Sequence, residues 1–80
     1  MMNDPTPTEA REVLFVYGRE GGQQPGSFAE SLIRTMQLAD AFNLARLRSA
    51  FPGYATAVGW MIHFEDGAER LRQVASEVRR

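Results

Sequence analysis

The chain has 80 residues, too few for two domains that each bury a core, so we expect residues 13–80 to form one helical domain behind a flexible tail, residues 1–12. It has no cysteine, which excludes disulfides and thiolate metal sites. Nine dispersed basic residues, all arginine, balance ten acidic ones. This charge pattern predicts no nucleic-acid partner, because binding to phosphates needs a clustered basic face.

The segment 13–17, with the sequence VLFVY, is the first apolar element of the chain. Its β-branched and aromatic residues, followed by the glycine-rich stretch 18–26, favour a short strand. A helix is the alternative, because Thr6-Pro7-Thr8-Glu9 has the form of a capping box and apolar residues then recur at helical spacing from Ala10 to Tyr17. We predict the strand. Since a lone strand leaves its backbone groups unpaired, we expect it to pair with a second copy of the chain or with another protein.

The stretch 18–26 holds four glycines and a proline, which predicts a mobile connector. It does not contain the glycine spacing of a phosphate-binding loop. Ser27 and Glu30 then have the spacing of a capping box, where a helix should begin. The apolar residues from Phe28 onwards recur at helical spacing and predict one buried face.

The fold class that follows is mainly α, a compact bundle of about four short helices over residues 28–39, 41–51, 53–64 and 67–79. Asp40 interrupts the apolar pattern and is predicted to cap a new helix, the alternative being one bent helix over residues 28–51. The FPG sequence at residues 51–53 joins the second and third helices. Asp66 is predicted to cap the last.

The helix expected over residues 53–64 is apolar over more than half of its girth, and only Thr56, Gly59 and His63 form a polar strip. Such a helix is typically central. In so small a domain, we expect a partner to cover its second side. Together with the predicted strand it forms the candidate interaction surface, which consists of Tyr54, Trp60, Met61, Phe64, Val13, Phe15 and Tyr17.

Enzymatic chemistry is not indicated, because His63 is the only imidazole and neither of the nearest acids in sequence, Glu65 and Asp66, stands four residues from it on a helix. We therefore predict no catalytic residue, cofactor or metal site. The leader-like pattern of a targeting signal is missing from the first residues, and no apolar run reaches the roughly 18 residues that span a bilayer. A soluble, cytoplasmic protein without a membrane partner is expected.

Protein binding is the predicted function, because aromatic residues, methionine and arginine dominate contact energetics, and the chain has eight, four and nine of them. A small DNA-binding regulator is the alternative, with a helix-turn-helix around residues 51–53. Its reading helix, residues 54–64, would however contain no arginine, asparagine or glutamine.

Residues 25–58 contain a recognisable pattern: PGSF at the start of a helix, Ala39-Asp40 with Asn43, Arg46-Leu47, and Phe51-Pro52 followed by Tyr54. This pattern resembles small uncharacterised proteins encoded by phages of actinobacteria. The resemblance implies a phage gene and carries over no catalytic residue. We expect an accessory protein that binds a protein of the bacterial host, alone or as a homodimer, or a minor virion or assembly component.

Overall fold

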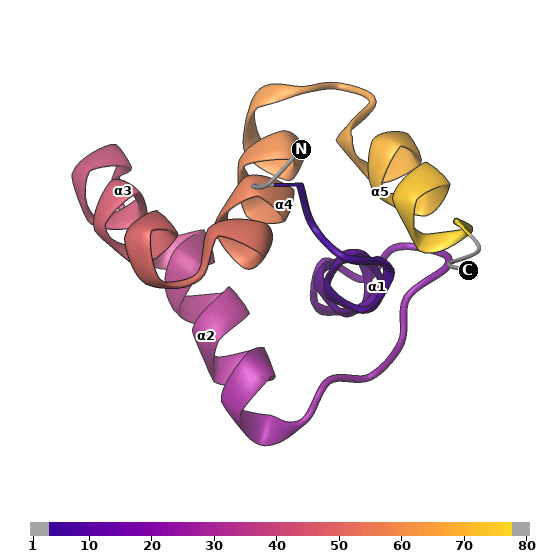
Figure 1. The fold of residues 1–80 in the computed structure, drawn as a ribbon, viewed down its shortest axis with the longest axis horizontal. Coiled ribbons are helices and arrows are strands. Elements are labelled where there is room, and N and C mark those ends of the chain that lie inside the picture. Colours follow the sequence, from indigo (N-terminus) through magenta and orange to yellow (C-terminus); the bar gives the residue numbers. More distant parts are fainter. Residues whose placement is uncertain (1–3, 78–80) are drawn as a thin grey trace.

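The computed structural model describes residues 4–77, and in this part of the chain it contains five helices and no strand. The helices are α1 (Pro7–Val16), α2 (Ser27–Leu38), α3 (Ala41–Ala50), α4 (Pro52–His63) and α5 (Gly67–Ala75). Figure 1 shows α1 end-on, surrounded by α2, α4 and α5, whereas α3 lies at the edge of the molecule and packs on α4. The radius of gyration of 11.4 Å is typical of a compact fold.

The prediction of a strand at residues 13–17 is wrong, because this segment is the second half of α1. The capping box is present: Thr6 Oγ1 accepts from the Glu9 backbone N–H at 3.1 Å, and Glu9 Oε1 accepts from the Thr6 backbone N–H at 2.9 Å. Pro7 occupies the first turn. These local signals start the helix, while the β propensity of VLFVY reflects packing in a sheet that this fold does not supply.

Because residues 7–16 form α1, the predicted tail and the predicted strand pairing have to be revised. Residues 7–12 are helical rather than part of a flexible tail, and residues 1–3 lie outside the described residues. Val13 and Leu14 are fully buried within the domain. The backbone of α1 is satisfied by its own helix, so the reason to expect a strand-paired homodimer no longer holds.

The loop between α1 and α2 was predicted as a mobile connector, and hydrogen bonds tie it to the rest of the fold. The Gln23 backbone N–H donates to the Arg11 carbonyl at 3.0 Å, and Arg72 Nη1 donates to the Glu20 carbonyl at 3.2 Å. Gly18 and Gly21 have φ values of 70° and 91°, which glycine adopts without strain. The loop is therefore held along α1 and α5 (Figure 1).

The predicted break at Asp40 is confirmed. Asp40 Oδ1 accepts from the Asn43 backbone N–H at 2.7 Å, and α3 starts at the next residue. The predicted Ser27–Glu30 capping box is wrong, because the residue before α2 is Gly26 and no side chain caps this helix. Glu30 instead accepts from Arg34, one turn later, at 3.0 Å.

The last helix also differs from its prediction in detail. Asp66 precedes α5 but its carboxylate does not cap the backbone, because Asp66 Oδ1 accepts from Arg70 Nε at 3.0 Å. The helix ends at Ala75 rather than at residue 79, and residues 78–80 lie outside the described range. Arg11 Nη1 donates to the carbonyl of Ala75 at 2.7 Å, so a side chain from α1 satisfies the carboxyl end of α5.

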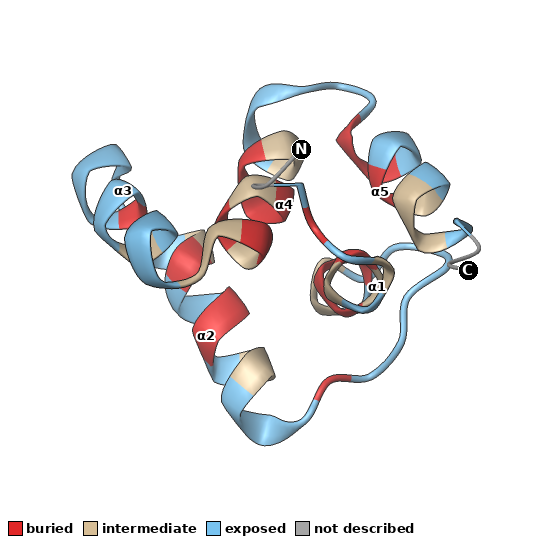
Figure 2. Ribbon diagram, viewed as in Figure 1, coloured by how far each residue is buried: buried red, intermediate tan, exposed pale blue. Residues whose placement is uncertain are grey.

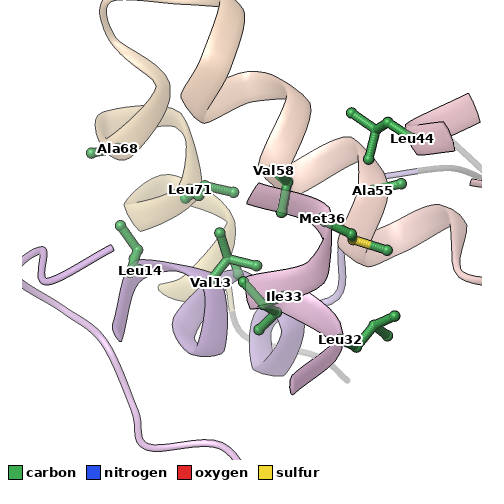
Figure 3. Close-up of a cluster of buried hydrophobic side chains, with 12 residues drawn as sticks. Val13, Leu14, Leu32, Ile33, Met36, Leu44, Ala55, Val58, Ala68 and Leu71 are labelled. Carbon is green, nitrogen blue, oxygen red and sulfur yellow. The ribbon is translucent and has the colours of Figure 1, made fainter. Parts of the chain in front are cut away.

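The core lies where α1, α2, α4 and α5 meet. Figure 3 shows Val13, Ile33, Val58 and Leu71 converging from these four helices. The buried hydrophobic residues are Ala10, Val13, Leu14, Leu32, Ile33, Met36, Leu44, Ala55, Ala57, Val58, Ala68 and Leu71. Each large side chain among them contributes about 1.5–3 kcal/mol by leaving water. The chain thus covers most of α4 with its own helices.

Candidate interaction surface

The seven residues predicted to form the interaction surface differ in their exposure. Val13 is fully buried in the core, Tyr17, Tyr54, Trp60 and Met61 are half-buried against it, and only Phe15 and Phe64 are exposed. Tyr54 lies in the first turn of α4, and Phe64 follows its last residue. At about 1.5 Å per helical residue they are about 15 Å apart along the axis.

The Tyr54 side chain has a hydrogen-bond partner within the chain. Its hydroxyl donates to Glu12 Oε1 at 2.5 Å, and Glu12 is a buried carboxylate on α1. Burial and the hydrogen bond to Glu12 raise the pKa of Tyr54 far above its ordinary value. Because the bond joins α1 to α4, we assign Tyr54 to the packing of these helices.

Tyr17 and Phe64 also have partners in the domain. Burial raises the pKa of Tyr17, and a hydrogen bond with the Gln37 side chain on α2 opposes this shift. The Arg70 guanidinium lies 4.3 Å from the centre of the Phe64 ring. Such cation–π contacts stabilise an exposed aromatic ring by about 0.5–1 kcal/mol.

The most exposed large hydrophobic side chains lie on α2 and α3. Leu38 is 88% exposed, Phe28 68% and Phe42 67%. Figure 2 shows α3 mostly exposed, and Leu44 is its only residue classed as buried. The sequence pattern missed this surface, since it predicted Phe28 to lie on the buried face of its helix. The available signal was the phase shift of the apolar pattern at Asp40, which marks the start of a separate helix.

A pocket of about 420 Å³ opens between the end of α2 and α3. Its lining, which we call the α2–α3 wedge, consists of Thr35, Leu38, Ala39, Asn43, Arg46 and Leu47. The end of α2 supplies Thr35 and Leu38, and Asn43, Arg46 and Leu47 stand at i, i+3 and i+4 on α3, so each helix presents one face to the pocket. The short connection at Ala39 and Asp40 joins the helices at a corner, and both pack on α4. The corner therefore stays open between them.

One unpaired cation lines this pocket. The Arg46 guanidinium lies 4.6 Å from the centre of the Phe42 ring, and within residues 4–77 it forms no ion pair. Arg34, by contrast, is bound to Glu30 on its own helix at 3.0 Å. The α2–α3 wedge is thus an apolar hollow with a positive charge in its wall. Such a hollow is suited to bind an apolar group that has an acidic neighbour.

The described residues offer little other chemistry. His63 is exposed at the end of α4, and no group of three histidine or acidic side chains in residues 4–77 is placed to hold a metal ion. None of the helices in this range has the length and apolarity to cross a bilayer. Comparison with protein-family models, curated proteins and solved structures found no match to this chain. Its function has to be inferred from its own surface.

Proposed function

We propose that this protein is a binding module for another protein, and that its contact surface is the α2–α3 wedge with the neighbouring Phe42. The observation that carries this proposal is the exposure of Leu38 and Phe42 beside an apolar pocket of about 420 Å³. Large apolar side chains gathered on one exposed surface typically mark a contact with another macromolecule.

The residue types of this surface also support protein binding. Aromatic side chains and arginine recur among the residues that dominate contact energies, and Phe42 and Arg46 lie stacked next to the pocket. The wedge holds one cation and no histidine, carboxylate or cysteine, so it offers no acid–base pair for catalysis. We therefore propose a non-enzymatic role.

The partner we propose is a protein of a bacterial host. The resemblance of residues 25–58 to small proteins of actinobacterial phages supports this choice, and the wedge lies within these residues. A DNA-reading role for α4 receives no support, because α4 packs on α1, α2, α3 and α5 with Ala55, Ala57 and Val58 fully buried. A reading helix has to present its side chains to the major groove.

A capture experiment with matched variants tests this proposal. The wild-type protein, Leu38→Lys and Ile62→Lys are immobilised separately and incubated with lysate of an actinobacterial host. Leu38 and Ile62 are both exposed, so both variants should fold, and Ile62 is on α4 outside the wedge. We expect a protein that the wild type and Ile62→Lys retain and Leu38→Lys loses. Identical captured proteins on all three would contradict the proposed surface.

A further inference from the structure

We propose that the α2–α3 wedge binds an acidic amphipathic helix of its partner, with an apolar side chain in the pocket and a neighbouring carboxylate on Arg46. This inference rests on the proposed function and specifies the chemistry of the partner segment. It follows from three features of the wedge: its shape, its charge, and the poor fit of the other possible occupants.

The shape of the wedge is that of a groove between helices. Thr35, Leu38 and Ala39 form one wall, and Asn43 and Leu47 belong to the other. A third helix laid along such a groove inserts its side chains between the two rows, as in ordinary helix packing. The volume of about 420 Å³ falls in the range of about 300–1,000 Å³ typical of binding pockets, which is enough for a large apolar side chain.

The positive charge of the wedge favours a partner segment that contains acidic residues. The helix α3 contains Arg46 and Arg48 and no acidic residue, although the whole chain has a net charge of −1. The nearest carboxylate in sequence is Asp40, and it accepts the Asn43 backbone N–H at 2.7 Å. Arg46 is therefore not neutralised within the described chain. A partner carboxylate forms two parallel hydrogen bonds with a guanidinium, which adds both affinity and orientation.

The other occupants of the groove fit less well. A symmetric dimer centred on the wedge would bring each Arg46 towards its copy, because the residues near a two-fold axis face themselves. Duplex DNA would place Leu38, 88% exposed, and the apolar pocket against a phosphate backbone that needs basic contacts. An acidic amphipathic helix satisfies both the apolar wall and the cation.

The test is a selection from a display library of random peptides long enough for about four helical turns, using the 80-residue chain. We expect enriched peptides to carry apolar residues at helical spacing and an excess of Asp and Glu. Their affinity should fall about tenfold to a hundredfold with Arg46→Glu, and peptides with Lys in place of the acidic residues should then bind better. The variant Arg19→Glu makes the same change in charge on the α1–α2 loop and should leave the affinities unchanged.

The outcomes separate this inference from the proposed function. Enriched peptides that lose affinity with Leu38→Lys but show no acidic excess and no response to Arg46→Glu would overturn the acidic partner and keep the binding surface. Failure to enrich any peptide, or peptides unaffected by Leu38→Lys, would overturn both. A mass in solution of twice 9.0 kDa that Leu38→Lys halves would show that a second copy fills the wedge, which also overturns the inference.

Discussion

The helices α3 and α4 follow one another in the chain and occupy opposite environments. The helix α4 packs on α1, α2, α3 and α5, and five of its residues are buried. The helix α3 packs mainly on α4 and buries only Leu44. Figure 2 shows this contrast as a helix with much buried surface beside one that is almost entirely exposed.

This contrast shows that a helix with a broad apolar girth need not be the one that contacts a partner. The small residues Ala55, Ala57 and Val58 let the neighbouring helices approach α4 closely, so most of its girth is covered within one chain, although Ile62 is exposed. The helix α3 is less apolar but has too few neighbours to cover Phe42. The surface available for a partner is therefore set by the arrangement of the helices and not by the apolar content of one of them.

The largest expected effect is a difference in stability between two variants, one that shortens a leucine of the core and one that shortens a leucine of the wedge. Leu71→Ala empties space around a fully buried side chain, so we expect the free energy of unfolding to fall by about 2–5 kcal/mol. Leu38→Ala removes a side chain that is 88% exposed and should change it by less than about 0.5 kcal/mol. Urea unfolding followed by circular dichroism measures both. Similar losses for the two variants would mean that the wedge is a structural part of the core.

A second variant tests how tightly the α4 side of the molecule is packed. A Cβ at Gly67 would collide with the carbonyl oxygen of Trp60, at the joint between α4 and α5. Because this obstacle is backbone, the joint has to shift, and we expect Gly67→Ala to lower the free energy of unfolding by about 1–3 kcal/mol. Thermal unfolding would detect this change. An unchanged midpoint of thermal unfolding would show that the joint between α4 and α5 can shift easily. It would contradict the tight packing that distinguishes α4 from α3.

Of the features that depend on local sequence, some could be predicted, whereas the predicted Ser27–Glu30 capping box and the side-chain cap at Asp66 are absent. The capping box from Thr6 to Glu9 and the cap at Asp40 are both present, and the predicted bounds 28–39, 41–51 and 53–64 agree with α2, α3 and α4 within one residue. The first capping box was outweighed by the strand-like composition of residues 13–17. That choice was wrong, because strand propensity has physical meaning only where a sheet exists to pack against.

The features that depend on contacts between residues far apart in the sequence could not be predicted from it. Arg11 caps α5 through the carbonyl of Ala75, and Glu12 accepts from Tyr54 across 42 positions. The wedge depends on the angle between α2 and α3, which packing on α4 sets and no residue pattern encodes locally. For the same reason Phe28 was placed on a buried face, although it is 68% exposed.

The third prediction concerns the bond between α1 and α4. Tyr54→Phe leaves the buried Glu12 carboxylate without its donor and should lower the free energy of unfolding by about 1–2 kcal/mol. The folded state raises the pKa of Tyr54, whereas the unfolded chain releases this proton near pH 10. The contribution is therefore complete below about pH 10 and is lost as the pH rises above it.

Measuring stability by urea unfolding between neutral pH and pH 11 tests both parts. Tyr54→Phe should be less sensitive than the wild type to the rise above about pH 10. Tyr17→Phe is the comparison, since burial also raises the pKa of Tyr17, and its removal should reduce the sensitivity as well. If the stability of Tyr54→Phe fell above about pH 10 as much as that of the wild type, then Tyr54 would not be held in its neutral form between α1 and α4.

The smallest expected effect is a gain in stability where α3 and α4 meet. Gly59 is a glycine inside α4, and the nearest atom to a Cβ placed there is Arg48 Nη2 of α3, at 3.4 Å. This atom ends a flexible side chain and is at an ordinary contact distance, so Gly59→Ala should raise the free energy of unfolding by about 0.5–1 kcal/mol through the lower entropy of the unfolded chain. Thermal unfolding beside Gly67→Ala gives the measurement. A loss in both would show that α3 is packed on α4 as tightly as α5 is, and the contrast between the two sides of α4 would then not hold.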